Sequence, residues 1–375
     1  MSKYLSYLTC IFVFISFNSC HKQADEPIQV EAEIVKEMEA ESIPSVVACI
    51  IKEDQIVWKE AFGYADIKKE VPANSQTIYT LMSISKLFIG VATMQLWEQG
   101  RIDLEADINQ YLPFEVRNPK FPDDKITTSM LLNYTSGLAW PEDEDRIPAF
   151  YEFFDDDKTP HISEWLPEYI FLGGEYYRSS VWKNYRPGEK ELYSNIATPL
   201  LALIVEQISG QDFRDYCREF ILDPLEMHQT AYRFSELDES LLATPYIGIA
   251  TPFKQFNYRL YPAGNLKSNI DDFSHFMMAI LNYGEYNGNR ILHRNTIEEM
   301  FTVQNPASGV SNIFWHCMGD CIGHSGGGTG FSTRAEWYFE SHMAMLIFTN
   351  KANNLVYPQG SIYELVRYKA NEFKD

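Results

Sequence analysis

Segments with the pattern of β-strands lie near the two ends of this chain, and segments with helical periodicity lie between them. The predicted strands are Ser45–Ile51 and Ile56–Phe62 near the start, and Arg334–Phe339 and Met343–Phe348 near the end. From Leu87 to Leu281 most apolar runs repeat with a period near 3.6 residues. A strand cannot bury its apolar face alone, so we expect the two ends to come together in one sheet.

Amphipathic helices are predicted outside these strands, at Glu26–Glu41 and Ser361–Phe373. A further short strand is expected at Ile313–Trp315. The predicted fold class is therefore α/β, of the α+β type. It consists of an antiparallel sheet built from the N- and C-terminal segments and flanked by helices, plus a mostly helical lobe.

The composition fits a large hydrophobic core and argues against a nucleic-acid partner. The chain has 375 residues, 45% of them hydrophobic, which is enough for one large domain or two closely packed ones. Its formal net charge of -21 is the opposite of the basic face that nucleic-acid binding requires. The sequence contains no paired histidines with metal-ligand spacing, so we expect no metal and no other cofactor.

The first 19 residues have the features of an export signal. Lys3 precedes an apolar run, Tyr4–Phe17, that is too short to span a bilayer comfortably. The run ends at Cys20 and turns polar, an arrangement that resembles a bacterial lipobox. We expect lipidation of Cys20 and anchoring of an exported protein to a membrane of the bacterial cell envelope, on its periplasmic or surface face. The alternative is simple cleavage nearby without lipidation.

The remaining cysteines are too few for a disulfide scaffold. Cys317 and Cys321 could close a disulfide across a tight turn in an oxidising compartment, although spacing alone does not prove the bond. Cys49 lies in an apolar strand and is expected to be a small buried hydrophobe.

Ser83 and Lys86 are three residues apart at the start of a long apolar run. On a helix these positions share one face, so the hydroxyl and the amine would meet there. A serine hydroxyl becomes a good nucleophile when a neighbouring base takes its proton. An amine can act as that base if burial lowers its pKa, and the apolar neighbours of Lys86 would supply the burial. The alternative is a capping serine and a solvated lysine.

Two later segments could also contribute to a site. Tyr193 and Asn195 stand where a loop becomes an apolar helix; the phenol could relay a proton and the carboxamide could bind a substrate amide. The alternative is a packed tyrosine and a capping asparagine. In Gly323–Phe331 the many glycines allow close approach of a ligand, and an N–H there could form an oxyanion hole with that of Ser83. The alternative is a glycine-rich turn with His324 at the surface.

The segment Ala139–Arg186 mixes acidic clusters, at 142–145 and 155–157, with many aromatic residues. The acidic residues are expected to form a solvated loop, the alternative being a cation site. The aromatic residues are expected to fill a small core, and a long insertion of this kind is also where a substrate wall would lie.

The order of these motifs resembles that of the serine β-lactamase and penicillin-binding protein superfamily, in its class C-like branch. The resemblance runs from about Ser45 to Asn350. It rests on Ser83-x-x-Lys86, Leu131–Leu138, Tyr193-Ser-Asn195, Asp223–Met227, Pro262–Gly264 and Gly323–Gly327.

The resemblance implies a β-lactamase/transpeptidase-like fold and assigns roles to the site residues. Ser83 would be the acylated nucleophile, with Lys86 and Tyr193 handling its proton. Asn195, His324, Ser325 and Gly326 would bind substrate, and the N–H groups of Ser83 and Gly327 would form the oxyanion hole. In this division residues 1–19 are the signal peptide, 20–43 a tether and N-terminal helix, and 44–375 the hydrolase domain. Its sheet part is 44–78 and 285–375, and its helical lobe is 79–284.

The function implied is a serine hydrolase that acts through an acyl-serine on an ester or amide of a small molecule or peptide. Esterase, D,D-peptidase and D-aminopeptidase activities are the expected types. True β-lactamases of this branch usually have lysine where this chain has His324. Histidine is neutral for much of the time at pH 7, so antibiotic resistance is not the expected main role. The alternatives are a penicillin-binding sensor without turnover and an acyltransferase. The sequence does not indicate an oligomeric state.

Overall fold

The computed structural model describes residues 28–140, 150, 152–154, 158–302, 313–314, 316–317 and 321–374. The signal peptide, Cys20 and the acidic clusters at 142–145 and 155–157 lie outside these residues. Cys317 is described by its backbone alone, so the disulfide between Cys317 and Cys321 stays a prediction.

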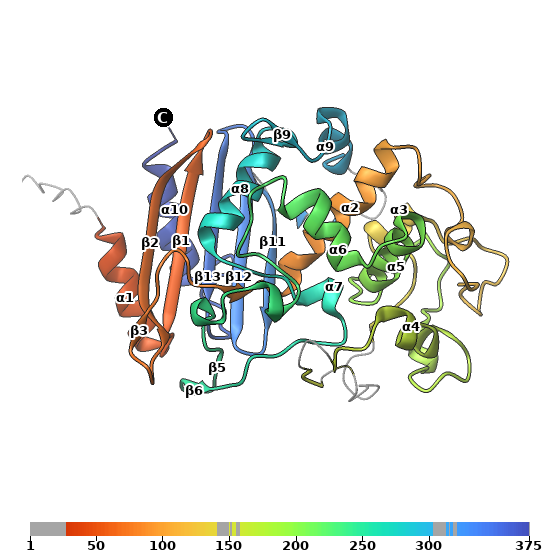
Figure 1. The fold of residues 1–375 in the computed structure, drawn as a ribbon, viewed down its shortest axis with the longest axis horizontal. Coiled ribbons are helices and arrows are strands. Elements are labelled where there is room, and N and C mark those ends of the chain that lie inside the picture. Colours follow the sequence, from red (N-terminus) through yellow and green to blue (C-terminus); the bar gives the residue numbers. More distant parts are fainter. Residues whose placement is uncertain are drawn as a thin grey trace, which may run out of the picture.

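A seven-stranded antiparallel sheet joins the two ends of the chain, which confirms the predicted fold class (Figure 1). Its strand order is β10-β11-β12-β13-β1-β2-β3. The strands are β1 (Ser45–Lys52), β2 (Gln55–Asp66), β3 (Val71–Pro72), β10 (His316–Cys317), β11 (Ile322–Gly328), β12 (Phe331–Tyr338) and β13 (Met343–Thr349). The central pair β1 and β13 sets Val47 opposite Phe348, so residues from the two termini build the middle of the sheet.

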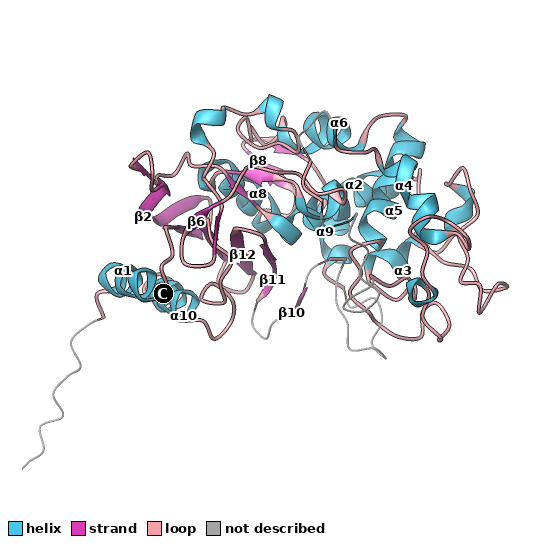
Figure 2. Ribbon diagram, turned by 90° about the horizontal axis from the view of Figure 1, so that it is seen from below, coloured by secondary structure: helices cyan, strands magenta, loops and turns pink. Residues whose placement is uncertain are grey.

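The sheet is covered on both faces because the side chains of its central strands alternate. On β1, Val46, Ala48 and Ile50 belong to a core formed with α1 (Val30–Ala40) and α10 (Ser361–Asn371). The intervening residues of β1 belong to the larger core on the opposite face. The helices α1 and α10 lie side by side on the outer face, away from the helical lobe (Figures 1 and 2).

Helix α8 (Ile270–Leu281) covers the inner face of the sheet. The Phe273 ring lies 5.8 Å from the Phe348 ring, and Trp337 Nε1 donates to the Met277 carbonyl at 3.0 Å. The sequence placed this helix inside the helical lobe at 79–284, whereas the structure packs it on the sheet. Its residues are buried almost all round, which lets it contact the sheet and the lobe together.

The helical lobe surrounds α2, in which every residue from Lys86 to Leu96 is buried. Such a helix, apolar on all sides, forms the centre of a lobe rather than its surface. The helices here are α2 (Lys86–Glu98), α3 (Thr128–Leu132), α4 (Ile162–Ile170), α5 (Ala197–Ser209), α6 (Phe213–Cys217), α7 (Tyr261–Gly264) and α9 (Arg294–Met300). Helix α5 ends at Gly210, whose φ of +77° is left-handed.

Within the described residues, three two-stranded sheets complete the fold. They are β4 (Tyr79–Thr80) with β7 (Lys267–Ser268), β5 (Tyr246–Ile247) with β6 (Thr251–Pro252), and β8 (Glu285–Tyr286) with β9 (Asn289–Arg290). The pairing of β4 with β7 joins the segment just before Ser83 to the segment that follows α7.

The strand expected at Ile313–Trp315 begins later, because Ile313 and Phe314 form a buried turn and β10 starts at His316. Across the described part of the chain we find no helix with the length and apolar character needed to span a membrane.

Candidate active site

Ser83 lies in a single 3-10 turn, Met82–Ser85, that leads directly into α2. Met82 before it has a φ of +52°, a left-handed conformation that is uncommon for a residue with a side chain. Ser85 holds the turn, because its hydroxyl donates to the Met82 carbonyl at 2.6 Å and accepts from Leu266 N at 3.1 Å. Residues with a strained backbone conformation, fixed by the surrounding structure, cluster at functional sites.

The amine of Lys86 points back at this hydroxyl, as the three-residue spacing predicted. Lys86 Nζ lies 2.8 Å from Ser83 Oγ and 3.1 Å from the carbonyl oxygen of Ala263 in α7. The side chain is completely buried, and this burial lowers the pKa of Lys86, against the opposing influence of Tyr193. A lowered pKa increases the fraction of neutral amine, which is the form able to accept a proton.

Tyr193 approaches Ser83 from the loop before α5. Its hydroxyl lies 3.0 Å from Ser83 Oγ, and Lys86 Nζ lies 5.1 Å from the centre of its ring. Tyr193 is 39% exposed, so its hydroxyl can reach both solvent and Ser83. The structure therefore brings together Ser83, Lys86 and Tyr193, the three groups that the sequence predicted to do the chemistry.

Tyr134 packs against Tyr193. The sequence did not indicate this contact. The two rings are 4.9 Å apart, and the Tyr134 carbonyl accepts from Leu192 N at 2.8 Å. Tyr134 is buried and has a φ of +59°, a second strained position beside the site. Burial raises the pKa of Tyr134, which keeps its hydroxyl neutral next to Tyr193.

A cavity of about 330 Å³ opens beside Ser83. It is lined by Met82, Ser83, Trp140, Phe150, Asn195, Tyr258, Leu260, Ala263, Gly264, Gly327, Gly328 and Thr329. None of these described lining residues has a formal charge. Trp140 and Phe150 come from the aromatic-rich segment Ala139–Arg186, so part of that segment does form a cavity wall. Tyr258 is fixed by Asn265, whose side chain bonds its backbone N at 3.0 Å and O at 2.8 Å.

The remaining predicted site residues fall into two groups. Asn195 and Gly327 line the cavity together with Ser83. His324, Ser325 and Gly326 do not line it, although they belong to the same strand, β11. His324 is 3% exposed, and its Nδ1 lies 2.6 Å from the Ser325 carbonyl oxygen. A surface position for His324, the alternative considered from the sequence, is therefore wrong.

Gly326 packs directly on the turn that contains Ser83. A Cβ at this position would lie 2.1 Å from the Leu81 carbonyl oxygen, so no side chain fits here. Thr333 Oγ1 donates to the same Leu81 carbonyl at 2.8 Å. The glycine-rich strand and the nucleophile turn are thus held against each other by close backbone packing.

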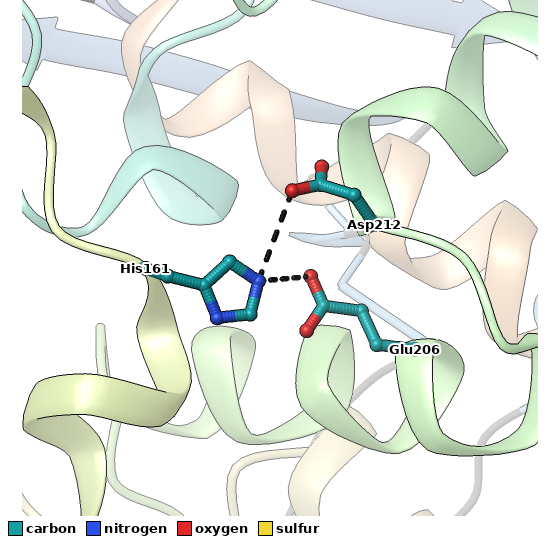
Figure 3. Close-up of side chains that lie close together, drawn as sticks. All are labelled: His161, Glu206 and Asp212. Carbon is teal, nitrogen blue, oxygen red and sulfur yellow. Dashed lines mark hydrogen bonds and ion pairs between the residues drawn. The ribbon is translucent and has the colours of Figure 1, made fainter. Parts of the chain in front are cut away.

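A separate cluster of titratable side chains lies in the helical lobe (Figure 3). His161 Nε2 is 3.2 Å from Glu206 Oε1 and 3.7 Å from Asp212 Oδ2. Such a set could hold a metal ion, but Arg214 binds Asp212 at 2.7 Å and Arg233 lies 3.3 Å from it. These guanidinium groups supply the positive charge that a cation would otherwise supply, so we interpret the cluster as an ion-pair network.

The fold and the serine–lysine–tyrosine arrangement together define a class of protein. Comparison with known protein families shows which family this chain belongs to. The Beta-lactamase family model matches residues 30–365, so this chain belongs to that family. This confirms the resemblance found in the sequence.

Individual relatives are distant. The chain is similar to Protein flp of Staphylococcus aureus (strain MW2), 26% identical over 69% of this chain and 49% of that protein. It is also similar to the mitochondrial serine beta-lactamase-like protein LACTB of Bos taurus, 25% identical over 64% of this chain and 54% of that protein. The chain thus spans about half the length of the curated relatives it matches.

Solved structures show the same fold. An octameric penicillin-binding protein homologue from Pyrococcus abyssi superposes with a TM-score of 0.71 at 22% identity, over 92% of this chain and 76% of that chain. A beta-lactamase/D-alanine carboxypeptidase from Pseudomonas syringae gives a TM-score of 0.68 at 18% identity, over 92% of this chain and 97% of that chain. At these identities the likeness establishes the fold alone.

Proposed function

We propose that this protein is a serine hydrolase that acts through an acyl-serine intermediate on an ester or amide. One observation supports the proposal most directly: Ser83 Oγ lies within hydrogen-bond distance of both Lys86 Nζ, at 2.8 Å, and Tyr193 OH, at 3.0 Å. A nucleophile with a base in bonding reach, and a second group orienting the pair, is the arrangement that activates a hydroxyl.

In the acylation step Ser83 Oγ attacks the substrate carbonyl carbon and loses its proton to the Lys86–Tyr193 pair. The carbonyl oxygen becomes negative, and two backbone N–H groups, of Ser83 and Gly327, would stabilise it. The tetrahedral intermediate then collapses, the bond to the leaving group breaks, and the leaving group takes up the proton. Each such N–H donor typically contributes about 3 to 4 kcal/mol to transition-state stabilisation.

In the second step water releases the acyl group. The hydroxyl of Tyr193 is on the solvent side of the site and Lys86 is on the buried side. We assign proton abstraction from the attacking water to the Lys86–Tyr193 pair: the Tyr193 oxygen takes the proton of the water as the phenol passes its own proton to the neutral amine of Lys86. When the tetrahedral intermediate collapses, the pair returns this proton to Ser83 Oγ. The products are a carboxylic acid and the free serine.

The cavity favours substrates with an uncharged, apolar acyl group. Its walls include Trp140, Phe150 and Tyr258, and no described lining residue supplies a fixed charge for a substrate carboxylate. His324, at the position where β-lactamases of this branch usually have lysine, is buried outside the lining. We therefore expect esters to be better substrates than D-alanyl-D-alanine peptides or β-lactams, both of which carry a carboxylate.

Covalent labelling tests the proposal. A fluorophosphonate or penicillin probe should label the wild-type protein, and Ser83→Ala should abolish labelling while the fold stays intact. Ser240→Ala, which changes an exposed serine that is not among the cavity-lining residues, is the matched control and should label normally. If Ser83→Ala still labels, Ser83 is not the nucleophile. Hydrolysis of nitrocefin, p-nitrophenyl acetate to octanoate, D-Ala-D-Ala peptides and D-aminoacyl amides then defines the substrate class.

Two alternatives use the same site. A penicillin-binding sensor would form a stable acyl adduct without release. An acyltransferase would transfer the acyl group to an added alcohol or amine, giving a product that water alone does not give. Mass spectrometry of the labelled protein and of the products separates these cases from hydrolysis.

We also propose that the protein is exported and lipid-anchored through Cys20, on the strength of the apolar run and the cysteine that ends it. Cys20→Ser should abolish incorporation of labelled palmitate, whereas Cys10→Ser, within the same apolar run, should not. Equal incorporation in both variants would contradict the assignment.

A further inference from the structure

Tyr357 lies in the segment after β13 and contacts the glycine-rich strand β11 from the side of β12. Its hydroxyl is 2.9 Å from the carbonyl oxygen of Gly326 and 3.4 Å from Ser332 Oγ. Thr333 Oγ1 also approaches the Gly326 carbonyl, at 3.5 Å. The carbonyl of Gly326 therefore points toward two hydroxyl groups on one side of the strand.

The N–H of the next residue, Gly327, belongs to the same peptide unit. The peptide bonds of the described residues are trans, and in a trans peptide the C=O and N–H point in opposite directions. Because the carbonyl points toward Tyr357 and Thr333, the Gly327 N–H points away from them. On that side the described residues of β10 pair with β11 at Ile322 and Gly323, and Gly327 lines the cavity next to Ser83.

We propose that Tyr357 is a positioning residue for the oxyanion hole. By binding the Gly326 carbonyl, its hydroxyl fixes the plane of the Gly326–Gly327 peptide and polarises it, so that the Gly327 N–H is directed at the substrate oxygen. This inference rests on the proposed function and adds to it a residue that does not touch the substrate.

The direction of the hydrogen bond follows from the surrounding groups. A carbonyl can only accept, so the Tyr357 hydroxyl is the donor. Ser332 Oγ donates its own proton to the Asn353 carbonyl at 3.1 Å and lies 3.4 Å from the Tyr357 hydroxyl, whereas the Gly326 carbonyl lies at 2.9 Å, so the shorter bond of the Tyr357 proton is the one to Gly326. Burial raises the pKa of Tyr357, so the hydroxyl keeps this proton over the pH range in which the enzyme would work.

The same hydroxyl explains why residue 327 is a glycine. A Cβ added at Gly327 would lie 2.3 Å from the Tyr357 hydroxyl oxygen, while the next nearest atom, Tyr357 Cζ, would be at an ordinary 3.5 Å. The obstacle to a side chain at 327 is thus one oxygen atom. Gly327 and Tyr357 are coupled, and substitutions at the two positions should not act independently.

Tyr357→Phe removes only the hydroxyl and tests the proposal. We expect about a 10-fold fall in kcat for a p-nitrophenyl ester and in the rate constant for labelling of Ser83 by a fluorophosphonate, with KM unchanged. Tyr246→Phe is the matched control, since it also removes one hydroxyl bonded to the backbone, at Ile67 N, and does so away from the cavity. Its labelling rate should equal that of the wild type.

Gly327→Ala should lower the labelling rate at least about 100-fold, because the new Cβ displaces the peptide that contains the N–H. In the double variant Gly327→Ala, Tyr357→Phe the clash with the hydroxyl is absent. Its rate should be equal to or higher than that of Gly327→Ala alone. If the loss of labelling rate in the double variant equals the product of the losses in the two single variants, the two positions act independently and the inference is overturned.

The outcomes separate this inference from the proposed function. If Ser83 is labelled as fast in Tyr357→Phe as in the wild type, the positioning role of Tyr357 is overturned, and the proposed function is not affected. If Tyr357→Phe loses rate but also has a raised KM and a lower melting temperature, and Tyr246→Phe shows neither change, the effect is structural. That result also overturns the positioning role. A wild-type protein that is not labelled at Ser83 overturns the proposed function, and the positioning role with it.

Discussion

The amine of Lys86 lies 2.8 Å from the hydroxyl oxygen of Ser83, at the end of a side chain that is completely buried. Burial disfavours the charged ammonium and lowers the pKa of Lys86. The rate of Ser83 acylation should therefore rise with pH as Lys86 loses its proton, at a pKa below the ordinary lysine value of about 10.4. Measurement of kcat/KM against pH checks this.

Substitution of Lys86 should remove that dependence. Lys86→Ala lacks the base, and Lys86→Arg keeps a permanent charge that accepts no proton. Both should lose about 100- to 10,000-fold in rate, the usual contribution of a general base. If kcat/KM of Lys86→Ala still rises with pH as it does in the wild type, a group other than Lys86 is responsible for that rise.

Tyr193 should be important for rate and unimportant for stability. Tyr193→Phe removes a hydroxyl 3.0 Å from Ser83 Oγ on a side chain that is 39% exposed. We expect a fall of about 100-fold or more in Ser83 labelling, and a change within about 0.5 kcal/mol in the free energy of unfolding. Stopped-flow labelling and urea denaturation give the two quantities.

Tyr185→Phe is the matched control for this variant. Tyr185 belongs to the same loop region and its ring lies 5.6 Å from Lys190 Nζ, whereas the hydrogen bonds described for Ser83 Oγ come from Lys86 and Tyr193. Tyr185→Phe should label at the wild-type rate. Equal labelling of Tyr193→Phe and Tyr185→Phe would exclude Tyr193 from proton transfer.

The sequence predicted the local part of the site well, because Ser83 and Lys86 are neighbours along one turn and need no tertiary information. Tyr193 is 110 residues from Ser83, and periodicity could not place it there. Only the order of the motifs and the family resemblance predicted that pairing. The sheet was predictable because strand patterns at both ends of a chain have few ways to bury their apolar faces.

The supporting residues were not predictable, since their roles depend on packing between distant segments. Tyr134 and Tyr357 are tyrosines among many, and nothing in their sequence neighbours indicates a contact with Tyr193 or Gly326. Ala263 contributes only its backbone carbonyl to Lys86, which leaves no side-chain signal. Strand β11 is rich in glycine and has low β-propensity, so its strand conformation comes from pairing with β12 and packing against the Met82–Ser85 turn.

The aromatic cavity wall should set the length of acyl chain that the proposed hydrolase accepts. Trp140 lines the cavity and its ring lies 5.5 Å from that of Phe150. Trp140→Ala opens space at this wall, so longer acyl chains gain buried contacts, each methylene contributing about 0.8 kcal/mol or roughly fourfold. The ratio of kcat/KM for p-nitrophenyl octanoate to that for butanoate should rise at least several-fold.

Phe171→Ala is the control, because Phe171 packs edge-on against Phe114 outside the cavity lining. Its chain-length profile should match that of the wild type. A Trp140→Ala profile that is also unchanged would place the acyl group elsewhere.

The cluster of His161, Glu206 and Asp212 should make stability depend on pH (Figure 3). The hydrogen bond to Glu206 raises the pKa of His161 above its ordinary value, with smaller contributions from the charges of Glu206 and Asp212. A raised pKa in the folded state means that protonated His161 stabilises the fold below about pH 6.5, the unfolded-state value. This contribution is lost as the pH rises through the folded-state pKa.

His161→Gln removes the titrating group and should destabilise the protein more at pH 6 than at pH 8.5. The difference should be below about 1 kcal/mol, because His161 is partly exposed and solvent screens its charge. Urea denaturation of both proteins at the two pH values measures it, and titrations elsewhere cancel in the comparison. Since His161 caps α4, whose Trp165 and Tyr169 pack on Phe150, the ion pair also supports the cavity wall. A destabilisation that is equal at both pH values would show that capping alone, and no charge on His161, holds α4 in place.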